Sequence, residues 1–185
     1  CLPYIDSETV HWINELGGIK VLALSHPHFY DSMVSWSHAF DRAPIFIPKV
    51  DQEWVMRPDP VIHFWSGLPE ELVPGVTLIQ CGGHFPGSSV LHWEDGAGGQ
   101  GALLVGDSII VGMDRGQVSF MHSYPNFLPL SAEFVQGIVD AVAPYPFDRI
   151  YGGWWDRNVS SNAKQILEDS AKRYQQLLLP KSQGS

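Results

Sequence analysis

The sequence has little positive charge and no long apolar run. Only 11 Lys and Arg stand against 20 Asp and Glu among 185 residues, a formal net charge of -9. Proteins that bind nucleic acids or anionic membranes usually present basic stripes, so this balance argues against both kinds of partner. No apolar run reaches the roughly 18 residues that a membrane-spanning helix needs.

Cysteine is nearly absent as well. Cys1 and Cys81 cannot build a disulfide framework, which favours a reducing compartment and predicts a cytoplasmic protein. The first residue is Cys rather than Met, and we expect the chain to begin partway through a longer protein. Hydrophobic residues make up 44% and charged residues 17%, which predicts one folded domain over residues 1–185 with a disordered tail at 181–185.

Apolar spacing predicts helices that alternate with short strands. Helices are predicted from Ser7 to the Gly17-Gly18 pair, over 31–40, over 131–142, and from Ser160 or Ser161 to about Leu179. Runs of branched apolar residues predict strands at 19–24, 44–48, 61–65, 76–80, 89–93, 102–105 and 148–151. The Gly-rich segment 95–101 is predicted to be a hairpin turn. This mixture indicates an α/β or α+β fold, in which sites gather at the carboxyl ends of strands.

Several of these strand ends carry residues suited to chemistry. The strand 19–24 runs into Ser-His-Pro-His, with His26 and His28, and the strand 76–80 runs into Cys-Gly-Gly-His, which ends at His84. Imidazole is a common zinc ligand, and two histidines at i and i+2 can reach one ion from an extended turn. These three histidines form a candidate metal site. Asp107, which follows the strand 102–105, is predicted to supply a fourth ligand or to orient bound water.

Each piece also has an ordinary interpretation. A His-x-His pair among eight histidines is weak evidence for a metal, because most histidines lie on surfaces or in satisfied core positions. Cys81 is more often a small buried hydrophobe than a ligand. The strand ends taken in order indicate more than any one of them.

Taken together, Ser-His-Pro-His, Gly-Gly-His-Phe-Pro-Gly-Ser and Leu-Leu-Val-Gly-Asp resemble successive motifs of the metallo-β-lactamase-fold hydrolases. The resemblance spans about residues 19–155 and implies a four-layer αββα sandwich. It implies that His26 and His28 match the first two histidines of a His-x-His-x-Asp-His turn. It also implies that His84 matches the family's next histidine and that Asp107 matches an aspartate that commonly bridges two metals.

The sequence departs from the family at its second metal site and at its start. Tyr30 and Asp31 stand where the turn has its aspartate and last histidine, and Trp154 replaces a final histidine, so the resemblance implies one ion. Only about 18 residues precede the strand 19–24, where the family has several leading strands. We expect part of the N-terminal strands to be lacking, which would expose an apolar sheet face and favour a homo-oligomer.

The leading hypothesis is a hydrolase with one ion, most simply zinc, held by the three histidines. Bound water, acidified towards neutral pH, would attack an ester, lactone, thioester or similar carbonyl of a small-molecule substrate. Asp31 or Asp107 would then orient the nucleophile, and Tyr30 would donate a hydrogen bond to a developing oxyanion.

Two alternatives stay open. Two histidines and a carboxylate make the facial set of non-haem iron oxygenases. By resemblance to persulfide dioxygenases of the same fold, His28, His84 and Asp107 would hold iron. Alternatively, the chain is a non-catalytic binding module, in which aromatic residues line a pocket for a flat or apolar ligand. Those aromatic residues are Phe29, Tyr30, Phe85, Trp154 and Trp155.

Overall fold

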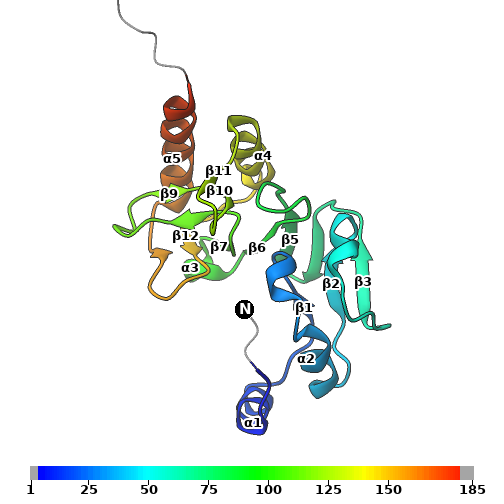
Figure 1. The fold of residues 1–185 in the computed structure, drawn as a ribbon. Coiled ribbons are helices and arrows are strands. Elements are labelled where there is room, and N and C mark those ends of the chain that lie inside the picture. Colours follow the sequence, from blue (N-terminus) through cyan, green and yellow to red (C-terminus); the bar gives the residue numbers. More distant parts are fainter. Residues whose placement is uncertain (1–3, 180–185) are drawn as a thin grey trace, which may run out of the picture.

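A computed structural model describes residues 4–179 (Figure 1). Its helices are α1 (Ser7–Glu15), η1 (Pro27–Phe29), α2 (Met33–Ala39), η2 (Lys49–Trp54), α3 (Gly96–Gly99), α4 (Ala132–Val142) and α5 (Ala163–Leu178), where η marks a 3₁₀-helix. None of the described helices is long and apolar enough to cross a membrane. Cys1 and the tail 181–185 lie outside the described residues.

The strands form one large and one small sheet. The large sheet has the order β13-β12-β7-β6-β5-β4 and the small parallel sheet the order β1-β2-β3. Strands of the large sheet are β4 (Glu70–Val73), β5 (Val76–Gln80), β6 (Ser89–Trp93), β7 (Ala102–Leu104), β12 (Arg149–Tyr151) and β13 (Asn158–Val159). Those of the small sheet are β1 (Leu22–Ala23), β2 (Ile45–Pro48) and β3 (Ile62–Trp65). Two short hairpins complete the set: β8 (Ile110–Val111) with β9 (Val118–Ser119), and β10 (Met121–Ser123) with β11 (Leu128–Pro129).

The layers follow from which strand faces are apolar. One side of the large sheet carries Ile79 of β5, Leu103 of β7 and Ile150 of β12. These three side chains join a core with α4 and α5. These two helices stand side by side against the sheet (Figure 1). A second core, around Met33 and Ile45, joins α2 to the small sheet. The expected mixed α+β fold is therefore confirmed.

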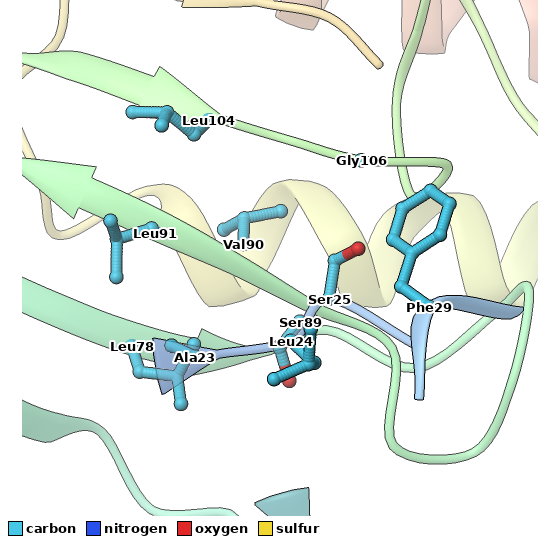
Figure 2. Close-up of a pocket in the computed structure, with 10 residues that line it drawn as sticks. All are labelled: Ala23, Leu24, Ser25, Phe29, Leu78, Ser89, Val90, Leu91, Leu104 and Gly106. Carbon is cyan, nitrogen blue, oxygen red and sulfur yellow. The ribbon is translucent and has the colours of Figure 1, made fainter. Parts of the chain in front are cut away.

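The other face of the large sheet turns towards the small sheet and is only partly covered. Leu78, Leu91 and Leu104 lie opposite one another across β5, β6 and β7 on this face (Figure 2). A cavity of about 260 Å³ separates them from the end of β1 and the residues after it, including Phe29. Leu104 remains 41% exposed. The sandwich is thus open over β7.

Most predicted elements are present, with different ends. The Gly-rich segment forms a tight turn, with φ of 53° at Ala97 and 70° at Gly98, and joins antiparallel β6 and β7 as expected. The run 19–24 pairs with β2 only over Leu22–Ala23. The first helix begins at Ser7 as predicted, and Asp6 caps it by accepting a hydrogen bond from the Thr9 N–H.

Candidate metal centre

The first two histidines follow β1 in a turn whose conformation is favoured by a proline between them. Proline opens η1 at Pro27, a position where its missing N–H costs nothing. His26 just before it is extended and 1% exposed, whereas His28 inside η1 is exposed. The Ser25 hydroxyl lies 3.0 Å from Nδ1 of His26. That contact orients the ring, so that Nε2 is the atom free to bind a cation.

The third histidine follows β5 in a loop that begins with two glycines. Gly82 and Gly83 have φ of 70° and 90°, a region that side chains with a Cβ rarely adopt. The chain then turns so that His84 is buried, and its Nδ1 donates to the carbonyl oxygen of His122 at 3.0 Å. Because that partner can only accept, Nδ1 carries the proton and Nε2 has a free lone pair.

Asp107 completes the group after β7. Gly106 before it has φ of 50°, and a Cβ there would lie 2.5 Å from the Ser25 hydroxyl, so only glycine lets the two loops approach. Oδ2 of Asp107 is 3.6 Å from Nε2 of His26 and 3.8 Å from Nε2 of His84. With His28 included, one ligand atom from each of the four residues lies within 4.8 Å of the others.

Burial decides the charge of the group. It lowers the pKa of His26 to about 3, with further lowering from His84 and His28. Burial also lowers the pKa of His84, against the opposing charge of Asp107, and raises the pKa of Asp107. The imidazoles of His26 and His84 are therefore neutral at pH 7, the form that binds metal. Nε2 of His26 and of His84 are both buried without a hydrogen-bond partner among the described residues. A cation between them would satisfy both.

Two further predicted site residues are not brought into this group. Tyr30 is 5% exposed and packs in the core of the small sheet, where its hydroxyl interacts with Asp51. This position leaves the expected oxyanion role without a supporting contact. Asp31 is exposed and accepts a hydrogen bond from the N–H of Ser32 at 2.6 Å.

Two residues to which sequence analysis gave no role support the ligands. Tyr124 packs its ring 5.5 Å from that of His84, and its hydroxyl donates to the carbonyl oxygen of Asp107 at 3.4 Å. His122 acts through its backbone, which no sequence pattern reveals. Both lie in or just after β10, a short strand with no clear periodicity.

The segment with Trp154 lies beside the group. A Cβ at Gly153 would be 3.3 Å from Oδ1 of Asp107, so the backbone passes close to this carboxylate. Trp154 and Trp155 are 58% and 97% exposed. They border an open hollow of about 370 Å³ together with Tyr151 and Asn158. The two tryptophan side chains are thus largely exposed beside this hollow.

Comparison with known proteins identifies one close relative. No family model matches the chain. The uncharacterized protein YmaE of Bacillus subtilis (strain 168) is 49% identical over 174 residues, which make up 94% of this chain and 63% of YmaE. The chain thus spans less than two thirds of the length of that relative.

Solved structures with the same layers are more distant in sequence. DIM-1 metallo-β-lactamase matches with a TM-score of 0.66 at 17% identity, over 94% of this chain and 78% of that one. The chain has the metallo-β-lactamase fold. An N-acyl homoserine lactone hydrolase, solved with product at its catalytic metal centre, shares this fold at a TM-score of 0.53 and 22% identity, over 78% of this chain and 60% of that one. TTHA1623 in a di-iron-bound form also shares this fold, with a TM-score of 0.55 and 18% identity, over 82% of this chain and 79% of that one.

Proposed function

We propose that the chain is a metal-dependent hydrolase that acts on an ester, lactone, thioester or similar carbonyl of a small molecule. The observation that carries this proposal is the convergence of His26, His28, His84 and Asp107, with two orphaned Nε2 atoms aimed at one point. The presence of a lactone hydrolase among proteins of this fold supports the reaction class. We propose zinc as the ion, because three imidazoles and one carboxylate are ligands that zinc favours.

The three histidines differ in burial, and we propose different roles for them accordingly. His26 and His84 are fixed by Ser25 and by the His122 carbonyl, so they hold the ion from the buried side. His28 is exposed and lies on the side open to substrate. A bound zinc ion lowers the pKa of coordinated water and polarises a carbonyl oxygen. Asp107 either binds the ion or orients water beside it, and its backbone is held by Tyr124.

An iron enzyme is the second candidate. His28, His84 and Asp107 form a two-histidine, one-carboxylate set of the kind that holds non-haem iron. A protein of this fold has been solved in a di-iron-bound form, which shows that the fold accommodates iron. Oxygen uptake with a persulfide substrate would favour this candidate over the hydrolase.

Metal content tests both candidates. The wild-type protein, His84→Ala and the control His63→Ala, which changes an exposed histidine on β3 outside the group, are purified without added metal and analysed by plasma mass spectrometry. We expect about one ion per chain in the wild type and the control, and much less in His84→Ala. Equal metal in all three would refute the site. Zinc with hydrolysis across a panel of lactones and thioesters would support the first candidate.

A further inference from the structure

A carboxylate outside the metal group is fully buried. Asp51 lies in η2, just after β2, and is 0% exposed. Burying a carboxylate is costly unless hydrogen bonds compensate it, so such a residue usually has a specific role. Its Oδ1 accepts the N–H of Gly87 at 3.0 Å. Gly87 belongs to the loop that carries His84.

The side chain of Asp51 also interacts with the turn that carries His26 and His28. Oδ2 of Asp51 and the Tyr30 hydroxyl are both buried, and neither has a hydrogen-bond partner among the described residues. The two side chains interact, and Tyr30 follows His28 by two residues. Glu53 is the charged neighbour that faces this carboxylate from its own helix. Asp51 therefore touches both segments that supply metal-binding histidines.

The contact between Asp51 and the His84 loop is too tight for a side chain. A Cβ on Gly87 would lie 2.4 Å from Oδ2 of Asp51 and 2.8 Å from Cβ of Pro48. The loop is also closed on itself, because the Ser88 hydroxyl accepts the N–H of Phe85 at 2.8 Å. A shift of Asp51 would therefore be transmitted along a stiff loop to His84.

We propose that Asp51 is a positioning residue of the metal centre. It holds the loop of His84 against the turn of His28, so that the imidazoles meet at one ion without Asp51 touching that ion. This inference rests on the proposed metal site and adds a residue to it. Removing a residue that orients a metal ligand typically changes metal affinity by about 10- to 100-fold.

The test compares variants of Asp51 with a buried control. Asp51→Ala removes both contacts, whereas Asp51→Asn keeps an oxygen that can accept the Gly87 N–H. Gly87→Ala disturbs the same contact from the other side. Ser37→Ala is the control: Ser37 is buried in α2 of the same half and donates to the carbonyl oxygen of Ala43, away from the histidines.

Cobalt(II) serves as the probe, with a chromophoric chelator as competitor. We expect Asp51→Ala and Gly87→Ala to raise the cobalt dissociation constant at least about tenfold and to change the visible absorption bands. Asp51→Asn should restore most of the affinity, and Ser37→Ala should leave affinity and spectrum unchanged. Amide exchange at Gly87 in the metal-free protein should be faster in Asp51→Ala than in the control.

The outcomes separate this inference from the proposed function. If the wild type binds no cobalt, both fail. If the wild type binds cobalt and Asp51→Ala binds it equally well with the same spectrum, only the positioning role fails. The same holds if Ser37→Ala weakens binding as much as Asp51→Ala, since general destabilisation would then explain the loss. Should Asp51→Ala not fold, Gly87→Ala and Asp51→Asn give the same comparison.

Discussion

His26 should make the metal-free protein lose stability as the pH falls. Its folded pKa is about 3, lowered first by burial and then by the charges of His84 and His28, against an ordinary value of 6.5. Between these two pH values the His26 imidazole is protonated in the unfolded chain but not in the folded chain. The difference in proton binding therefore costs no stability above pH 6.5, and it lowers the free energy of unfolding progressively as the pH falls towards 3. Each unit by which the pH falls within this window lowers the free energy of unfolding by about 1.4 kcal/mol, so the total loss at pH 5 is about 2 kcal/mol.

Urea unfolding with a chelator present, at pH 7.5 and pH 5, measures this loss. The free energy of unfolding of the wild type should drop about 2 kcal/mol more than that of His26→Asn, which cannot take up the proton. Because Asp107 has a raised pKa and acts in the opposite direction at low pH, the comparison between proteins isolates the histidine. The control His63→Asn should follow the wild type. Equal pH dependence in the wild type and His26→Asn would refute a buried, neutral imidazole.

Three further predictions concern the packing and the ion. Gly106→Ala should weaken metal binding, measured by chelator competition, because its Cβ would lie 2.5 Å from the Ser25 hydroxyl at a φ of 50°; unchanged affinity would contradict the close approach of the two loops. Leu103→Ala, at a 0% exposed position of the large core, should lower the free energy of unfolding in urea by about 2–5 kcal/mol. Chelation should lower stability by about 4 kcal/mol relative to protein with free zinc at about 1,000 times its dissociation constant, measured by thermal and urea unfolding; no shift would show that zinc does not bind the folded chain.

Sequence patterns predicted all three strands of the small sheet, but only four of the six strands of the large sheet, because β4 and β13 were missed. The strands 76–80 and 89–93 are correct to the residue, since each is a short run rich in apolar side chains between clear turns. The strand 19–24 was too long in the prediction, because its apolar run serves the core of the small sheet even where no ladder hydrogen bonds form. The short strands β8 to β11 carry too few residues for periodicity to identify them.

The ligand group was visible in the sequence, but its support was not. His26, His28, His84 and Asp107 stand at strand ends, where short spacing and known connection rules bring them together. Asp51 and Tyr124 act through contacts with residues 36 and 17 positions away, so no local pattern marks them. Tyr30 follows the histidine turn in sequence, yet it points into the small-sheet core, because a 3₁₀ turn rotates successive side chains to different sides.

The separations within the group indicate how Asp107 acts. Ligand atoms about 2.0–2.2 Å from one tetrahedral zinc are about 3.3–3.6 Å apart. The Asp107 Oδ2 distance of 3.6 Å to Nε2 of His26 is at the upper end of this range, and that of 3.8 Å to Nε2 of His84 exceeds it only slightly, so a small movement would make the carboxylate a direct ligand. Four protein ligands would close a tetrahedral site, and catalysis then needs a fifth position. Because His28 alone among the four is exposed, a substrate would reach the group from the side of His28, whose ring lies 5.0 Å from that of Phe85.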